Sequence, residues 1–206
     1  MPITIVTGPP GAGKTTVAAH LAAMSPLGVH IVGDDVFHWI VAGYVPPWMP
    51  DTSRQNGTVI SAIAAAATQF VNRGYDVFVD GIIGPWFLPH WLQTAGGDGP
   101  THYLVLRPSR QVAFARATGR RAPHDLVDPH PVSRMFDAFV DLGSFEAHVL
   151  DSSSQEIDAT IAMVRKGLHE GRYVLNPKDE VLDMDRLAVK FGIEPPDEYT
   201  GPSATP

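Results

Sequence analysis

The chain contains 206 residues, of which 44% are hydrophobic and none is cysteine, and its formal net charge is −7. This length suits a single domain with a substantial buried core, and the lack of cysteine excludes disulfides, thiolate catalysis and cysteine-based zinc sites. The acidic balance argues against a general nucleic-acid binder, because such proteins neutralise phosphates with clustered lysine and arginine.

Two further features of the sequence concern where in the cell the protein is found. The apolar stretches of the sequence are too short to cross a bilayer, so no contact with a membrane is expected. The N-terminal residues lack the basic region followed by an apolar region that is typical of a signal peptide. The sequence therefore predicts a cytoplasmic protein.

Apolar strands and helices alternate along the chain. Short apolar runs next to turn-forming residues predict five strands, at residues 3–7, 29–32, 76–81, 102–106 and 148–151. Helical spacing of apolar residues predicts five helices, at residues 13–23, 56–72, 109–118, around Met135 to Phe139, and at 157–168. This alternation indicates an α/β fold with a parallel sheet, helices on both faces, and the ligand at the carboxyl ends of the strands.

The segment TGPPGAGKTT, residues 7–16, joins the first strand to the first helix. It fits the phosphate-loop pattern GxxxxGK[ST], in which glycines let successive backbone N–H groups point into one concavity. The Lys14 ammonium would reach the β- and γ-phosphates of ATP, and the Thr15 hydroxyl would bind Mg²⁺. The alternative is an ordinary glycine-rich turn. The residues expected to bind the nucleotide are Gly8, Gly11, Ala12, Gly13, Lys14, Thr15 and Thr16.

Three aspartates follow predicted strands at the edge of the sheet where a ligand is expected. Asp34 and Asp35 could orient an acceptor hydroxyl, take its proton, or hold a water on Mg²⁺. On an extended segment, adjacent side chains point to opposite sides, so only one of the pair would face the phosphates, and which one is left open. Asp80 could bind the water shell of the metal. The alternatives are a helix cap for the pair and an Asp-Gly turn for Asp80.

An arginine-rich segment, RQVAFARATGRR, follows the fourth strand and precedes a region broken by prolines. Phosphoryl transfer needs cations over the migrating charge, and Arg116 and Arg120 would share one face if the helix continues. A solvated basic face is the alternative. The segment predicts a lid at about residues 116–133.

The sequence resembles the small P-loop kinases related to chloramphenicol phosphotransferase, gluconate kinase, zeta toxin and polynucleotide kinase. The resemblance covers residues 1–170 and is carried by GPPGAGKT, by strands that end in DD and VDG, by the arginine-bearing lid, and by HVLDSSSQEID. It implies a three-layer P-loop NTPase fold of the nucleoside-monophosphate-kinase-like type, with strand order 2-3-1-4-5.

The same resemblance implies roles for individual residues. Asp34 would be the catalytic base, Arg116 and Arg120 would bind phosphate beside Lys14, and the loop after the fifth strand would pack on adenine. The residues of that loop are Asp151, Ser152 and Ser153. The metal would lie among Thr15, Asp34 and Asp80. Residues 1–170 would form the kinase domain, and residues 171–206 an extension with a docking helix at 178–191 and a mobile tail.

Substrate choice is expected to depend on residues 36–57 and 82–95, which are rich in aromatic side chains. Aromatic rings could form the walls of a mostly apolar pocket, with polar contacts from an adjacent Arg-Gln-Asn sequence. Packing in the core is the alternative for each ring. The candidate residues are Asp35, Tyr44, Trp48, Arg54, Gln55, Asn56, Trp86, Phe87 and Trp91.

These patterns together predict an ATP-dependent phosphotransferase that acts on a hydroxyl of a small molecule, with ATP and Mg²⁺ as cofactors. Two alternatives stay open: an ATP-binding switch that hydrolyses ATP slowly, and a 5′-kinase of nucleic-acid ends. The chain lacks the dense basic surface expected for the latter, so a nucleic-acid partner is disfavoured. The oligomeric state is left open.

Overall fold

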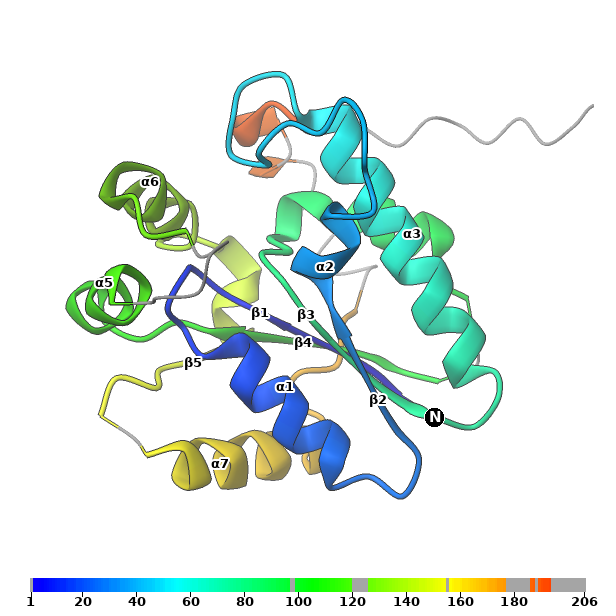
Figure 1. Ribbon diagram of the computed structural model, residues 1–206. Coiled ribbons are helices and arrows are strands. Elements are labelled where there is room, and N and C mark those ends of the chain that lie inside the picture. Colours follow the sequence, from blue (N-terminus) through cyan, green and yellow to red (C-terminus); the bar gives the residue numbers. More distant parts are fainter. Residues whose placement is uncertain are drawn as a thin grey trace, which may run out of the picture.

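The computed structural model describes residues 2–96, 99–119, 126–154, 156–176, 186–187 and 189–193. At its centre five parallel strands form one sheet in the order β2-β3-β1-β4-β5 (Figure 1). The strands are β1 (Ile3–Thr7), β2 (Gly28–Val32), β3 (Asp76–Asp80), β4 (Thr101–Leu106) and β5 (Val149–Leu150). The predicted fold class and strand order are confirmed.

Successive side chains of each strand enter two separate cores. Val77 and Val79 of β3 belong to one core, whereas Phe78 between them belongs to the other. Helices α3 (Ser53–Val71) and α4 (Leu88–Thr94) cover the first face, and α1 (Lys14–Ala23) and α7 (Ile157–His169) cover the second (Figure 1). Because side chains alternate across a strand, burial of both faces gives the continuous apolar strands of a three-layer fold.

The segment after β2 differs from the extended one expected from the sequence. Residues Gly33–Phe37 form a short helix, α2, with Asp34 and Asp35 in its first turn. Acidic side chains are favourable there because the N-terminus of a helix carries partial positive charge. The argument that the two side chains point to opposite sides of an extended segment is therefore wrong.

Short elements connect the main ones. The 3-10 helix η1 (Pro85–Phe87) leads into α4, and the 3-10 helix η2 (Gly143–His148), which the sequence did not predict, precedes β5. Helix α3 begins at Ser53, three residues before its predicted start at Asn56. Two of these three additional residues, Ser53 and Arg54, line the cavity described below.

Helices α5 (Arg110–Thr118) and α6 (Pro129–Ala138) lie next to each other at the β5 edge of the sheet (Figure 1). The Ser109 hydroxyl accepts a hydrogen bond from the Val112 N–H and caps α5. The Arg110 guanidinium lies 4.6 Å from the centre of the Phe136 ring of α6 and pairs with Asp137. Arg110 therefore holds the two helices together.

Part of the expected C-terminal helix falls within the described residues. Residues 186, 187 and 189–191 are helical, and Leu187 is fully buried in the core that contains α3. The rest of the predicted helix, and the predicted tail, lie outside the described residues. The described part nevertheless packs on the body of the protein.

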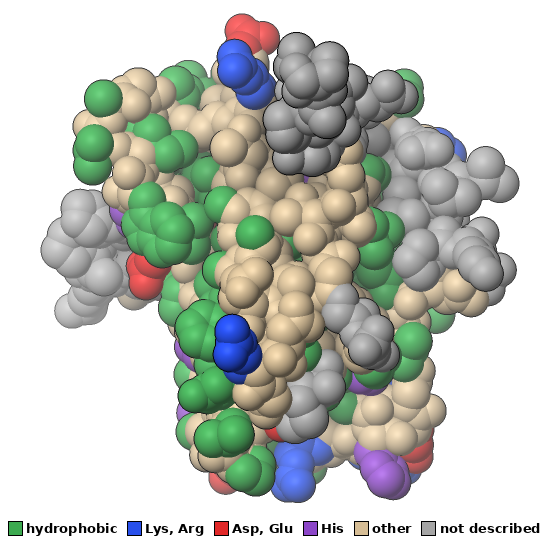
Figure 2. Space-filling view, turned by 90° about the vertical axis from the view of Figure 1, so that its right-hand side faces the viewer, with side chains coloured by type: hydrophobic (Ala, Val, Ile, Leu, Met, Phe, Trp, Pro, Cys, Tyr) green, Lys and Arg blue, Asp and Glu red, His purple; other side chains and the backbone are tan. Residues whose placement is uncertain are grey.

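The described part of the surface carries no large basic area on the face seen in Figure 2. Figure 2 shows one face, on which the described Lys and Arg side chains are separated from one another and form no continuous basic patch. Among the described residues, no helix combines the length and the apolar character that crossing a membrane would require.

Candidate active site

The phosphate loop connects β1 to α1 in a conformation that requires glycine. Gly8, Gly11 and Gly13 have φ angles of 141°, 79° and 92°, which side-chain-bearing residues rarely adopt. A Cβ on Gly8 would also lie 2.0 Å from the Leu106 carbonyl oxygen, and one on Gly11 would lie 2.0 Å from that of Ala113. The loop is thus pressed against β4 and α5, and only glycine fits these two positions.

The cationic side chain of the loop folds back over its own backbone. Lys14 is buried, and its Nζ donates a hydrogen bond to the Pro9 carbonyl oxygen at 3.1 Å. The same carbonyl accepts from the Ala12 N–H at 3.2 Å, so one of the expected phosphate donors is used within the loop. Helix α1 begins at Lys14 with no side chain capping it, which leaves its N-terminus open to an anion.

Asp80 lies at the end of β3 beside the loop and is buried, with 3% of its surface exposed. Its Oδ2 accepts a hydrogen bond from the Thr15 hydroxyl, and its Oδ1 lies 2.8 Å from Nε2 of His30 on β2. A histidine ring N–H donates to a carboxylate at such a distance. Both oxygens of Asp80 are therefore held in place, and His30 is a contributor that the sequence analysis missed.

Asp34 and Asp35 are both exposed, but they differ in what they face. Asp34 lines the cavity described below together with Lys14, whereas Asp35 is not among its lining residues. In a helix, neighbouring side chains diverge by about 100°, since 3.6 residues make a turn. The first turn of α2 therefore directs one carboxylate toward the cavity and the other away from it.

The predicted lid is described in part. Arg116 is exposed on the last turn of α5 and is not among the described residues that line the cavity. Arg120 lies outside the described residues. Two residues of α6, Arg134 and Met135, do line the cavity. Met135 lay on a predicted apolar helix face, but no pattern in the neighbouring sequence indicated that this face would cover a cavity.

The loop after β5 is organised around Asp151. Its Oδ1 accepts hydrogen bonds from the N–H and the hydroxyl of Ser153, and the Ser153 hydroxyl in turn accepts from the Ser109 N–H at 2.7 Å. Ser152 is buried, and its hydroxyl has no hydrogen-bond partner among the described residues. This loop is thereby fixed to the start of α5, next to the phosphate loop.

A bidentate ion pair joins the end of β4 to η2. Arg107, just after β4, donates from both terminal nitrogens to Glu146 of η2, each at 2.7 Å. The hydrogen bonds from Arg107 lower the pKa of the Glu146 carboxyl below its usual value of 4.5, partly offset by burial. This pair anchors η2 to the end of β4.

A cavity of about 570 Å³ opens between the phosphate loop, α2, the start of α3, η1 and α6. All of the predicted substrate residues except Asp35, Gln55 and Trp91 line it: Tyr44, Trp48, Arg54, Asn56, Trp86 and Phe87. Trp91 is instead fully buried in the core. Lining residues that the sequence analysis missed include Phe37, Thr52, Arg134, Met135, Phe191 and Ile193.

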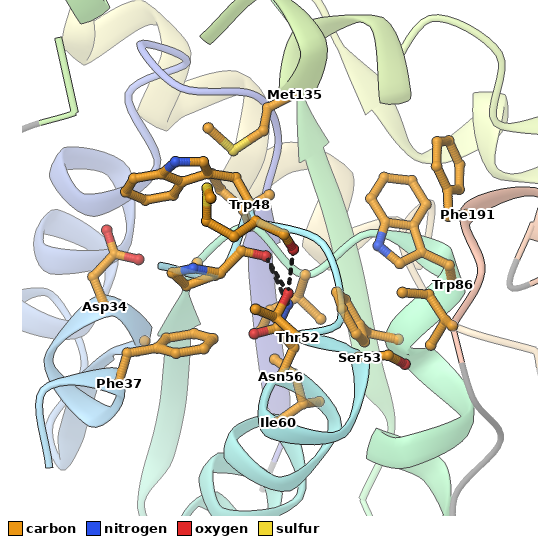
Figure 3. A pocket seen from close by; sticks show the side chains of 18 of the residues that line it. Asp34, Phe37, Trp48, Thr52, Ser53, Asn56, Ile60, Trp86, Met135 and Phe191 are labelled. Carbon is orange, nitrogen blue, oxygen red and sulfur yellow. Dashed lines mark hydrogen bonds between the residues drawn. The ribbon is translucent and has the colours of Figure 1, made fainter. Parts of the chain in front are cut away.

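The labelled side chains surround this cavity (Figure 3). Asp34 and Phe37 lie on one side of it, and Trp86 and Phe191 lie on the opposite side. Trp48 and Met135 extend over the space between them. The Asp34 carboxylate and the Trp86 and Phe191 rings therefore mark two ends of one site.

The segment that carries Tyr44 and Trp48 is held on the start of α3 by hydrogen bonds. The Gln55 side chain accepts from the Val45 N–H at 3.0 Å and donates to the Val45 carbonyl oxygen at 2.7 Å. Gln55 was predicted to contact substrate, but its amide is used by this backbone. Its role is to fix the position of the aromatic segment.

Thr52 and Asn56 make similar contacts further along the segment. The Thr52 hydroxyl lies 3.0 Å from the Pro47 carbonyl oxygen and 2.9 Å from that of Met49, and Asn56 Nδ2 donates to Pro47 at 2.8 Å (Figure 3). Asn56 Oδ1 is buried without a hydrogen-bond partner among the described residues. The donor groups on this wall of the cavity are thus engaged with the protein itself.

Electrostatics links Tyr44 to the carboxylate end of the site. Partial burial raises the pKa of the Tyr44 phenol above its usual value of 10.0, and the charge of Asp34 raises it further. The phenol is therefore protonated at neutral pH and keeps a hydrogen-bond donor beside the cavity.

A glycine-rich phosphate loop between the first strand and first helix of a parallel sheet in this order defines a P-loop protein of kinase-like fold. The chain also matches the AAA_33 family, described as an AAA domain, over residues 3–142, and it belongs to that family. Among curated proteins, none matches the chain.

Solved structures share this architecture. A sugar kinase from Janibacter sp. HTCC2649 superposes with a TM-score of 0.62 at 15% identity, covering 82% of this chain and 95% of that one. A gluconokinase from Sinorhizobium meliloti 1021 gives 0.55 at 16% identity, covering 92% and 94%. A thymidylate kinase from Candida albicans gives 0.53 at 15% identity, covering 84% and 94%. At these identities the likeness shows a common fold.

Proposed function

We propose that this protein is a phosphotransferase that moves the γ-phosphoryl group of ATP to a hydroxyl of a small molecule. The observation that carries the proposal is one cavity lined both by Lys14 of the phosphate loop and by the carboxylate of Asp34, with room beyond them for an acceptor. Cavities of several hundred Å³ with a few polar groups are typical of small-molecule sites. The kinase-like fold and the AAA_33 match support the same class.

The phosphate end of the site is built from backbone and one lysine. The three loop glycines let N–H groups turn inward, and the uncapped N-terminus of α1 adds its positive dipole. Lys14 would exchange its hydrogen bond to Pro9 for one to a phosphate oxygen. Asp151, Ser152 and Ser153 after β5 form a loop that is fixed to Ser109. This loop is proposed to lie beside the adenine ring of ATP.

The residues beside the loop fit a magnesium ion. Mg²⁺ prefers oxygen ligands and usually retains several waters, and the Thr15 hydroxyl and the Asp80 carboxylate are oxygen donors already in contact with each other. When bound, the ion would neutralise charge on the phosphate oxygens. The described residues contain no cluster of three or more acidic, histidine or cysteine side chains that could bind a metal without waters or nucleotide.

Asp34 is proposed to act on the acceptor. Its carboxylate would orient the hydroxyl and accept its proton while the acceptor oxygen forms a bond to the γ-phosphorus and the bond to the β,γ-bridging oxygen breaks. The products are ADP and a phosphate ester, and the proton passes from Asp34 to solvent. Arg134 on α6, which lines the cavity, would supply positive charge on the opposite side, a role that the sequence analysis assigned to Arg116 and Arg120.

The first prediction tests this assignment with a matched pair of variants. A screen of alcohols for acceptor-dependent ADP release identifies an acceptor, and kcat is then measured for Asp34→Asn and Asp35→Asn. We expect Asp34→Asn to lower kcat by about 10²- to 10⁴-fold, the range for a positioned base, without loss of ATP binding. Asp35→Asn is the control, because it carries the same charge change but does not line the cavity.

Two outcomes would count against the proposal. If Asp34→Asn keeps normal turnover, Asp34 is not the base, and if Asp35→Asn alone is impaired, the roles of the two residues are reversed. ADP release that no acceptor increases would instead indicate a slow ATPase or a switch.

A further inference from the structure

The end of the cavity opposite Asp34 is formed by two aromatic rings in contact, Trp86 and Phe191, whose planes are tilted by 47° (Figure 3). The centre of the Trp86 ring lies 4.3 Å from that of Phe191, and on another side it meets the edge of Phe139 at 5.4 Å. Trp86 is 6% exposed, so its indole is fixed by packing. Phe191 comes from the C-terminal segment, beyond the residues 3–142 that match the family. Of the two rings, Phe191 therefore comes from outside the part of the chain that matches the family, and Trp86 from within it.

The remaining inner surface is also poor in free polar groups. Ile60 and Ile63 of α3 and Ile83 after β3 line the cavity, and the donors of Thr52 and Asn56 are engaged with backbone carbonyl oxygens. The side chains of Arg54 and Arg134 are on exposed residues, at the solvent side of the cavity. Apart from Ser53 and Asn56 Oδ1, which has no hydrogen-bond partner among the described residues, the polar side chains that could meet a ligand are concentrated at the phosphate end and at the entrance.

This distribution of groups discriminates between classes of alcohol. A sugar or sugar acid carries a hydroxyl on most of its carbons, and each hydroxyl that loses water without gaining a partner weakens binding by roughly tenfold. A flat apolar ring, by contrast, gains contact with aromatic faces and loses little hydration. The cavity therefore favours a ligand with a hydroxyl at one end and a ring at the other.

We infer that the acceptor is an alcohol carried on a flat, largely apolar ring, and that Phe191 of the C-terminal segment selects it by packing, beside Trp86, against that ring. This inference rests on the proposed phosphotransferase function, because the acceptor hydroxyl must lie beside Lys14 and Asp34. It distinguishes the protein from the sugar kinase and the gluconokinase whose fold it shares.

The test compares two probes and three variants of the same helical segment. Binding of 2-phenylethanol and of sorbitol is measured by saturation-transfer NMR on the full chain in the presence of ADP and Mg²⁺, and turnover is measured by ADP release with ATP. We expect 2-phenylethanol to bind and to accelerate ADP release, and sorbitol to do neither. Phe191→Ala should raise KM for the ring alcohol about tenfold, with kcat changed less than twofold.

The control is Val189→Ala, in the same described segment, because Val189 is 81% exposed and is not among the lining residues. It should leave KM unchanged. Phe191→Leu keeps apolar volume and removes only the ring, so it should raise KM even if Phe191→Ala unfolds. Thermal unfolding curves of all three variants identify any loss of the fold.

Each outcome decides one of the two proposals. If sorbitol binds or is phosphorylated better than the ring alcohol, the inference is overturned while the phosphotransferase function stands. If neither probe binds, or if Phe191→Leu leaves KM unchanged, the inference is also overturned. If the ring alcohol binds through Phe191 but never increases ADP release, the ring site is supported and the phosphotransferase function fails.

Discussion

At the scale of single residues, His30 is the contributor that no sequence motif indicated. It lies on β2, in the middle of a strand, where a histidine resembles an ordinary strand residue. Its ring nevertheless contacts Asp80 Oδ1 at 2.8 Å, while the other oxygen of Asp80 faces Thr15. Groups that orient a metal-binding carboxylate in this way influence metal affinity although they do not touch the ion.

This contact leads to a prediction about Mg²⁺. His30→Ala removes the donor that fixes Asp80, so we expect the Mg²⁺ concentration for half-maximal turnover, at saturating ATP, to rise by about tenfold, the lower end of the usual range. His169→Ala is the control, since His169 is exposed on the last turn of α7. An unchanged Mg²⁺ requirement in His30→Ala would show that Asp80 does not depend on this hydrogen bond.

At the scale of secondary-structure elements, the sequence predicted the strands and the main helices well because their signals are local. Apolar runs and helical periodicity determine where β1 or α3 lies, and the phosphate loop follows from spacing within ten residues. Helix α2 was missed because five residues are too few to show a period. Missing α2 affected the predicted site, because the helical turn places Asp34, and not Asp35, in the lining of the cavity.

The packing of α3 on α4 gives a prediction at this scale. Gly57 of α3 is in contact with the buried His90 ring of α4, and a Cβ on Gly57 would lie 2.5 Å from the ring carbon Cε1. Alanine normally stabilises a helix by about 0.5–1 kcal/mol relative to glycine, but overpacking costs about 1–3 kcal/mol. We therefore expect Gly57→Ala to lower the free energy of unfolding by about 1 kcal/mol, as measured by urea denaturation.

A second variant makes this prediction specific. In the His90→Ala background the ring is gone, so Gly57→Ala should become neutral or stabilising, and the two changes should not be additive. A stabilising effect of Gly57→Ala in the otherwise unchanged protein would mean that α3 and α4 can separate at little cost.

At the scale of the whole molecule, the site brings together residues from most of the chain. Lys14 and Phe191 line the same cavity although 177 positions separate their numbers in the sequence. Sequence patterns identified the phosphate end, because its residues are adjacent to one another. The far wall, with Phe191 and Met135, depends on how helices pack in three dimensions, and no local pattern indicates that. The role of Gln55 was misjudged for the same reason, since its partner at Val45 is a backbone group.

Because the proposed nucleotide site joins β1, α1 and β3, occupying it is expected to stabilise the whole fold. A ligand present at 100 times its dissociation constant stabilises the native state by about 2.7 kcal/mol, which for a chain of this size corresponds to a Tm rise of roughly 5–11 °C. We expect ATP with Mg²⁺ to produce such a rise in the unaltered protein. In Lys14→Ala most of the rise should disappear, because the lysine is the cation of the phosphate loop.

The matched control for this measurement is Lys166→Ala. The Lys166 side chain is 75% exposed on α7, so removing it changes the net charge equally without altering the loop. Without ATP, Lys14→Ala should melt near the unaltered protein, since the hydrogen bond from Lys14 to the Pro9 carbonyl oxygen is of the kind worth about 1 kcal/mol. Equal ATP-induced shifts in Lys14→Ala and Lys166→Ala would mean that the nucleotide does not bind at this loop, and the proposed function would lose its basis.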